Sequence, residues 1–207
     1  MEVKDYIRFL SKNYIAVIII TLTFALITYL ITIAQPNTYQ SSASLEVIKL
    51  ETKPQSETPY FQYDNYYSYQ AASAASDNLI GWIESAATVA QVYNKAGYQI
   101  PSANIKDLSK TFTATKTVGT SAIVSISYSS KDKKQAEDMV STATEILKEK
   151  VEAYNKSSDQ KMFSAQYSEP VTVVAPKMEI LNVVIATFIG ILAAIGTISI
   201  REAIRIK

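Results

Sequence analysis

Residues 169–207 read EPVTVVAPKMEILNVVIATFIGILAAIGTISIREAIRIK, and this stretch decides how the chain is organised. Pro170 and Pro176 bracket a short β-rich run, after which no residue from Ile180 to Ile200 carries a charge. At about 1.5 Å rise per residue these residues span roughly 30 Å, the hydrocarbon thickness of a bilayer. We therefore expect residues 179–200 to form a membrane-spanning helix with a proline approach.

The two ends of this expected span differ in charge. Arg201, Arg205 and Lys207 follow it directly. A basic flank after an apolar span marks the cytoplasmic side of a membrane. The pattern predicts a cytoplasmic tail over residues 201–207.

Small residues recur along one face of the same segment. Ala186, Gly190 and Ala194 are four positions apart, with Thr197 alongside. Such a face lets a second helix approach closely, which predicts helix packing there. The alternative is that Gly and Ala are simply frequent in membrane helices.

A second apolar segment lies near the N-terminus. No residue from Ile15 to Ile33 is charged, and Lys4, Arg8 and Lys12 precede this run. We expect residues 1–14 to be cytoplasmic or interfacial and residues 15–34 to form the first membrane helix. Its own set of small side chains, expected to pack against the other span, comprises Thr21, Ala25, Thr28 and Thr32.

A cleaved signal peptide is the other interpretation of this N-terminal segment. Thr32, Ile33 and Ala34 resemble a cleavage site after a basic start. A secretory apolar core is usually about 7–15 residues long, which is shorter than this one. Length therefore favours a retained anchor, with both termini in the cytoplasm.

The residues between the spans, 35–178, are expected to form one extracytoplasmic α+β domain with a mixed sheet and packed helices. Alternation of apolar and polar residues predicts a strand over 39–50, and helical spacing is clearest over 130–154. Further expected helices cover 70–80, 83–96 and part of 101–110, with further strands over 111–117, 121–128 and 160–175. Pairing of the first and last strands would hold the two spans close together.

The helix boundaries carry specific capping signals. Ser85 is a candidate N-cap with Gly97 as the stop, Ser102 is expected to start the short helix, and Asp132 is placed to cap the long one.

An unusual group of tyrosines precedes the 70–80 segment. Amphipathic aromatic side chains stack on sugar rings, sit at lipid headgroups, pack between subunits or cover the edge of a small core. The sequence leaves these four roles open. The candidate contact residues are Tyr60, Tyr63, Tyr66, Tyr67 and Tyr69.

Composition argues against most catalytic chemistry. The chain has no cysteine and no histidine, which removes thiolate nucleophiles, the usual zinc ligands and the common base near neutral pH. Its five glycines form no phosphate loop, and the net charge of +1 provides no basic patch for nucleic acid. We expect no catalytic residue, cofactor, metal or nucleic acid, although an outer-face hydrolase using Asp132 and Glu137 stays a remote alternative.

Several short strings occur in a characteristic order. They are Tyr39-Gln-Ser-Ser-Ala-Ser-Leu-Glu-Val, Ile83-Glu-Ser-Ala-Ala-Thr-Val, Ala122-Ile-Val-Ser-Ile-Ser-Tyr, Lys131-Asp132 with Ala136, and Glu169-Pro170 with Pro176. This ordered set, with a span at each end, resembles the chain-length determinant family, the polysaccharide co-polymerases of bacterial surface-polysaccharide assembly. Ser141 stands where the family often has Asn, and the extended coiled coil of larger members is missing. The chain is thus similar to compact, capsular-type members.

The resemblance implies a membrane-embedded homo-oligomer in the plasma or inner membrane. Such a protein works beside a membrane polymerase and regulates the length of a capsule, exopolysaccharide or O-antigen type glycan without catalysing the linkage. Some relatives activate a tyrosine kinase. Because residues 201–207 contain no tyrosine, a kinase here would be a separate cytoplasmic protein, and this adaptor role is the second hypothesis.

Overall fold

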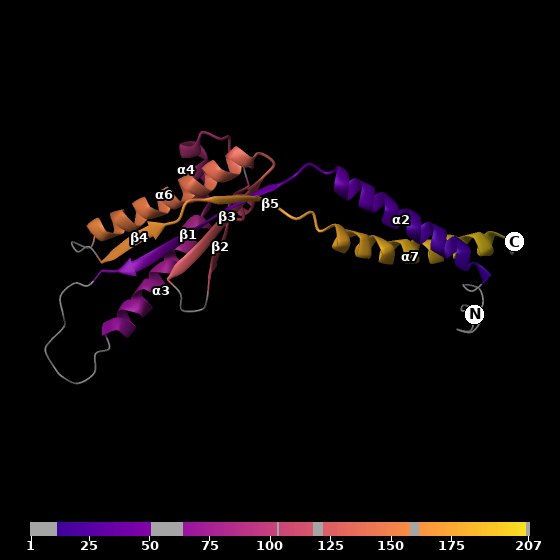
Figure 1. The fold of residues 1–207 in the computed structure, drawn as a ribbon, viewed down its shortest axis with the longest axis horizontal. Coiled ribbons are helices and arrows are strands. Elements are labelled where there is room, and N and C mark those ends of the chain that lie inside the picture. The colour runs from indigo at the N-terminus through magenta and orange to yellow at the C-terminus, as the bar shows by residue number, and fades with distance from the viewer. Residues whose placement is uncertain (1–11, 51–63, 103, 118–121, 158–161, 206–207) are drawn as a thin grey trace. The chain divides into compact units, whose positions relative to one another are not determined.

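The structure is a computed structural model that describes residues 12–50, 64–102, 104–117, 122–157 and 162–205. It divides into two compact units. Residues up to Asn37 and from Pro176 onward form a helical unit, and Thr38–Ala175 form an α+β domain. The helical unit contains α2 (Tyr14–Ala34) and α7 (Glu179–Arg205) (Figure 1).

The α+β domain is built on one sheet with helices inserted between its strands. The elements follow one another as β1 (Tyr39–Lys49), α3 (Asp64–Ile83), α4 (Ala86–Ala96), α5 (Ile105–Leu108), β2 (Thr113–Lys116), β3 (Ile123–Ser130), α6 (Lys133–Ser157), β4 (Phe163–Tyr167) and β5 (Val171–Val174). The strand order is β2-β3-β1-β4, and β5 also pairs with β1. This β-α-β-β-α-β arrangement is a split βαβ topology, in which β1 lies between the two strands joined by α6.

The α+β class with packed helices is confirmed, but the expected mixture of strand directions is not found. Every strand pairing among the described residues is antiparallel. The reason is topological. β3 and β4 run in the same direction, and β1 is inserted between them, so no two parallel strands are neighbours.

The last expected strand is two strands. β4 pairs with Leu45–Lys49 and β5 pairs with Tyr39–Ser42, which confirms that the first and last strands of the domain pair. Ser168 interrupts the ladder: its amide donates to Ser44 O, and its hydroxyl accepts from Ser44 N. Pro170, which has no amide hydrogen, follows in the gap.

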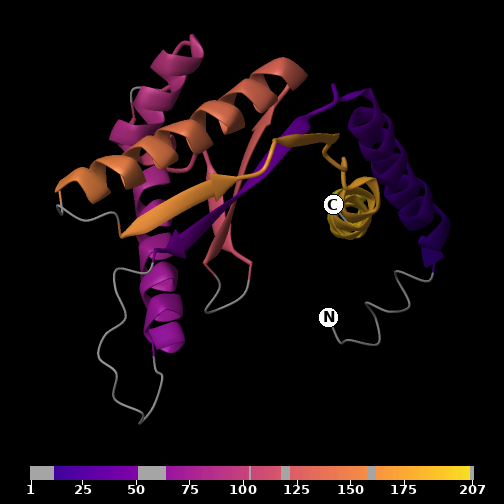
Figure 2. The ribbon, with the colours of Figure 1, turned by 60° about the vertical axis from the view of Figure 1, so that its left-hand side comes forward.

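The sheet has one buried face and one open face. Along β1, Ala43, Leu45 and Val47 are buried, while the alternate residues Ser44 and Glu46 are exposed. Such a two-residue period is what a sheet covered on one side produces. Helices α3 and α6 pack on the covered face (Figure 2), where Leu79, Met139 and Leu147 are fully buried in one core with Leu45.

Helix ends follow local capping rules, with one difference from the sequence expectation. Ser85 accepts from the Thr88 amide, Gly97 ends α4 at φ 77°, and Asp132 accepts from the Lys134 and Gln135 amides, as expected. The short helix α5 is capped by Asn104 instead of Ser102. Ser102, three residues before the helix begins, instead accepts from the amide of the capping residue Asn104.

Candidate functional site

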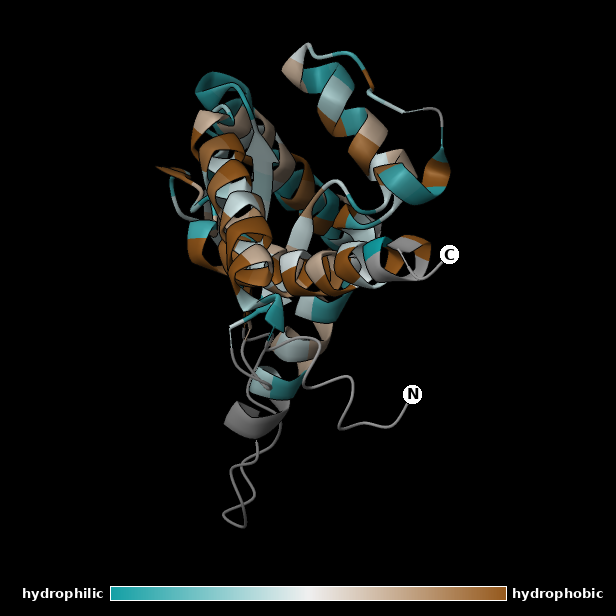
Figure 3. Cartoon of the chain, turned by 90° about the vertical axis from the view of Figure 1, so that its right-hand side faces the viewer, coloured by the Kyte–Doolittle hydropathy of each residue, from teal (hydrophilic) through white to brown (hydrophobic). Residues whose placement is uncertain are grey.

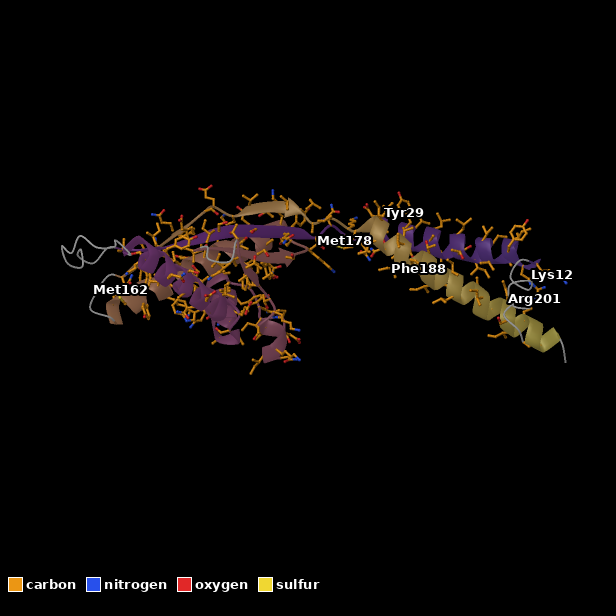
Figure 4. The ribbon with its side chains drawn as sticks, turned by 90° about the horizontal axis from the view of Figure 1, so that it is seen from below. Lys12, Tyr29, Met162, Met178, Phe188 and Arg201 are labelled. Carbon is orange, nitrogen blue, oxygen red and sulfur yellow. The ribbon has the colours of Figure 1, made fainter. Side chains whose placement is uncertain are left out.

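Helices α2 and α7 are long and apolar enough to cross a membrane, over Tyr14–Ala34 and Glu179–Arg201 respectively. Apolar residues cover most of both helices (Figure 3). The helices run antiparallel, since Thr32 near the end of α2 lies by Asn182 near the start of α7. Lys12 and Arg201 lie at one end of the pair and Met178 at the other (Figure 4).

The two helices approach each other closely at Gly190. A Cβ added there would lie 3.1 Å from Phe24 Cβ, 3.1 Å from Thr21 Cα and 3.4 Å from Thr21 O. Any larger side chain at this position therefore meets backbone that cannot rotate away. A Cβ added at Gly196 of α7 would have nothing within 4 Å. A larger side chain is therefore sterically restricted at Gly190 and has open space at Gly196.

The stripe of small residues continues on both sides of Gly190. Ala186 and Ala194 are buried on α7, and Thr32 is buried on α2. Thr21, Ala25 and Thr28 are half-buried along the same face of α2. Small side chains allow this close packing because helix association in lipid depends on van der Waals contact more than on a hydrophobic driving force.

Two residues differ from the sequence expectation for this face. Thr197 is exposed, and its hydroxyl donates to Ala193 O within its own helix at 2.8 Å. Ile198 is buried instead. The spacing indicates this position, because Ile198 continues the four-residue step from Ala194, but a stripe defined by small residues does not include isoleucine.

A group of polar contacts fixes the domain-side end of the helix pair. Lys177 Nζ donates to Ile33 O at 2.9 Å and to Gln35 O at 2.6 Å, which satisfies carbonyls at the C-terminus of α2. Asn182 Nδ2 donates to Lys177 O at 3.3 Å and to Thr32 Oγ1 at 3.4 Å. Met178, between these groups, has a φ of 50°, a left-handed conformation uncommon outside glycine. None of these contacts was anticipated, because each depends on bringing residues near 33 and 180 together.

The remaining expected site residues are dispersed. Tyr69 on α3 is 49% exposed. Tyr66 and Tyr67 lie in α3 without described side chains, and Tyr60 and Tyr63 lie outside the described residues. Lys12 and Arg201 are exposed, the Arg205 side chain is not described, and Lys4, Arg8 and Lys207 lie outside the described residues. Pro170 separates β4 from β5, and Pro176 directly precedes Lys177.

The shifted titrating groups of the domain are explained by structural contacts. The carboxylates of Glu149 and Glu145, which lie 2.8 and 3.2 Å from Lys95 Nζ, raise the pKa of that amine. Tyr98 donates to Asp138 Oδ2 at 2.9 Å, which raises the pKa of its hydroxyl. Burial is the main cause that raises the pKa of Tyr128. Within the described part of the chain, no group of three or more acidic residues, histidines or cysteines is placed to hold a metal ion.

Residues 1–96, just under half of the chain, match the family model described as Wzz, chain length determinant protein. This part of the chain is similar to that family. The matched part includes α2, β1 and α3 and ends at the last residue of α4. A search of curated proteins finds no match.

The family match and the candidate spans overlap in the N-terminal part of the chain. Its first candidate span and the first strand of its outer domain lie inside the matched residues. Together with the second candidate span, the match supports a protein of the inner membrane.

Proposed function

We propose that this chain is a non-enzymatic membrane scaffold that regulates the length of a bacterial surface polysaccharide, acting as a homo-oligomer beside a membrane polymerase. Residues 15–34 and 179–200 are its spans, and residues 35–178 form the extracytoplasmic domain. Residues 1–14 and 201–207 face the cytoplasm.

The observation that carries this proposal is the backbone-close contact at Gly190 in a chain that matches a chain-length determinant family. A protein that acts through geometry needs its spans held in one register. The register of α2 and α7 is supported by the close approach at Gly190, by the buried Ala186 and Ala194, and by the hydrogen bonds of Lys177. Charge supports the orientation, since Lys12 and Arg201 lie together at one end of the pair and basic flanks favour the cytoplasm (Figure 4).

Deletion of the gene tests the proposed function directly. Surface glycan from the deletion strain is separated by size on a gel, beside glycan from strains complemented with the wild-type chain, Gly190→Leu or Gly196→Leu. We expect deletion and Gly190→Leu to alter the length distribution, while wild type and Gly196→Leu restore it and the repeat-unit composition stays constant. Unchanged lengths after deletion would remove the proposal.

The second candidate is an adaptor that activates a separate cytoplasmic tyrosine kinase. It is favoured by the common location of Lys12 and Arg201 at one end of the helix pair (Figure 4), where a single cytoplasmic partner could contact both. Truncation after Ile200 is then expected to abolish partner phosphorylation while the protein still assembles. Phosphorylation that persists in the truncated chain would exclude this role.

A further inference from the structure

The α+β domain contains a half-open hollow of about 260 Å³ between α3, β1, α6 and β4. Its floor is apolar and belongs to the core, because Val47 and Val151 are buried. Its upper walls are aromatic: Trp82 and Phe163 are partly buried, and Tyr154 is 46% exposed. The volume is slightly below the roughly 300–1,000 Å³ range of small-molecule sites, so it suits no more than one ring.

A stripe of alanines creates the hollow. Ala71, Ala74 and Ala75 line it from α3, and Asn78 and Trp82 follow on the same helical face. Ala74 and Asn78 are exposed and Ala71 and Ala75 are partly buried, so the hollow opens at the surface of the domain and is not an interior void. The small side chains leave the hollow open between α3 and the aromatic residues that face it.

The aromatic wall formed by Phe163 is held in place by a buried amide. Asn155 donates through Nδ2 to Phe163 O at 2.6 Å, and its Oδ1 accepts from the Met162 and Phe163 amides at 3.1 and 3.0 Å. The rings of Tyr154 and Phe163 lie 6.3 Å apart with an interplanar angle of 46°. The wall is consequently positioned before any ligand arrives, which lowers the ordering cost of binding.

The lining also restricts the chemistry of a ligand. The described residues around the hollow include no charged side chain, and the Asn78 amide and the Tyr154 hydroxyl are their polar side-chain groups. An anionic ligand would lose its hydration without gaining a cation. A neutral ring with an apolar C–H face and hydroxyl groups on its edge satisfies both the aromatic walls and the amide.

We propose that this hollow binds one neutral pyranose ring of a glycan, stacked against Trp82 and Tyr154 with its hydroxyls toward Asn78. The choice of a sugar rests on the proposed function, whereas the neutral, ring-shaped character of the ligand rests on the lining alone. The scaffold would thereby hold the growing polymer at a defined point of each outer domain.

Trp82 is the single tryptophan of the chain, so its fluorescence reports on this hollow alone. The experiment uses the full-length chain in a detergent without a sugar headgroup, titrated with methyl β-glucopyranoside, methyl β-galactopyranoside and methyl N-acetylglucosaminide. Glucuronic acid and an alkyl alcohol of similar size serve as the acidic and apolar probes. We expect a saturable shift of the emission with at least one neutral pyranoside and none with the two other probes.

Filling the hollow provides the matched test. Ala74→Leu occupies the space, whereas Ala153→Leu adds the same atoms at an exposed position of α6 outside the lining. We expect Ala74→Leu to weaken pyranoside binding at least about tenfold, Asn78→Ala to weaken it less, and Ala153→Leu to leave it unchanged, with similar melting temperatures. Equal binding by Ala74→Leu and wild type, or saturation by the alkyl alcohol alone, would overturn the proposal.

The cellular readout separates this inference from the proposed function. If gene deletion changes glycan length while no pyranoside binds the wild-type chain, the sugar site fails and the scaffold stands. If pyranosides bind and deletion leaves glycan length unchanged, the scaffold fails and the site is retained as a sugar-binding site of another role.

Discussion

Leu22 of α2 and Leu45 of β1 are the same residue type in opposite environments. Leu22 is 62% exposed and Leu45 is fully buried. The contrast extends beyond this pair: most large apolar side chains of the helical unit are exposed, among them Phe188 (Figure 4), whereas a cluster of those in the domain forms a core. The exposed surface of the domain is instead polar on the open face of the sheet, where Ser44 and Glu46 lie.

The difference shows which solvent each unit is adapted to. The domain buries apolar area away from water, which stabilises it by about 25 cal/mol per Å². The helix pair would gain the same benefit from lipid without a core of its own, so its interior is free to use glycine, alanine and threonine for close approach.

Truncating each leucine should give the largest difference between the two environments. Leu45→Ala is expected to lower the free energy of unfolding by about 2–5 kcal/mol, because it leaves a cavity in a packed core. Leu22→Ala should change it by no more than about 0.5 kcal/mol, as for an exposed site. Denaturant unfolding of the full-length chain followed by Trp82 emission measures both, and similar losses would contradict the assignment of two environments.

A charge placed in each exposed apolar surface sharpens the same contrast. Leu22→Lys lies near the middle of α2, where a charged residue costs about 2.5–3.5 kcal/mol of membrane insertion. Ile48→Lys lies on the open face of the sheet, where Ile48 is 37% exposed, and should insert normally. The fraction of each variant that stays in membranes after an alkaline wash gives the result, and equal retention would argue against a lipid-facing α2.

The two glycines of α7 test the helix contact. Gly190→Leu should weaken pairing of the helices by about 1–3 kcal/mol through overpacking, whereas Gly196→Leu has open space and should not. Because the chain contains no cysteine, Thr32→Cys with Asn182→Cys reports pairing as disulfide yield in membranes. Unchanged yield with Gly190→Leu would remove the contact from the account.

The smallest expected effect is on how the stability of the domain depends on pH. Burial and the neighbouring Tyr93 hydroxyl, 3.4 Å away, raise the pKa of Tyr128 above its ordinary value of about 10. The neutral form is favoured in the folded state, so this stabilisation is present below pH 10 and is lost as the pH rises above it. The melting temperature should fall less between pH 9 and 11 for Tyr128→Phe than for wild type or for Tyr69→Phe, and identical slopes would contradict it.

Local signals in the sequence predicted much of the fold. The alternation around Leu45 gave β1 to within one residue, and Ser85, Gly97 and Asp132 placed the ends of α4 and α6. These features depend on neighbours in the chain, as capping and strand alternation do. The pairing of the first and last strands was predictable because each of them adjoins a candidate span.

Features that depend on distant residues were not predictable in the same way. The division of the last strand at Ser168 depends on Ser44 in another strand, and the hollow depends on how an alanine stripe in α3 meets Phe163 in β4. The backbone contact between Gly190 and Thr21 is similar: the small residues indicated a face but not which glycine would be used, and Thr197 proved to lie outside it. Tertiary contact decides such details, and local pattern does not.

Labelling of single cysteines in intact cells tests the central claim most directly, that two lipid-embedded helices hold the domain outside with both ends inside. Ser44→Cys, on the open face of the sheet, should react with a small membrane-impermeant maleimide in intact cells. Lys12→Cys and Arg201→Cys should react only after lysis. Labelling of either end in intact cells, or protection of Ser44→Cys, would contradict the account.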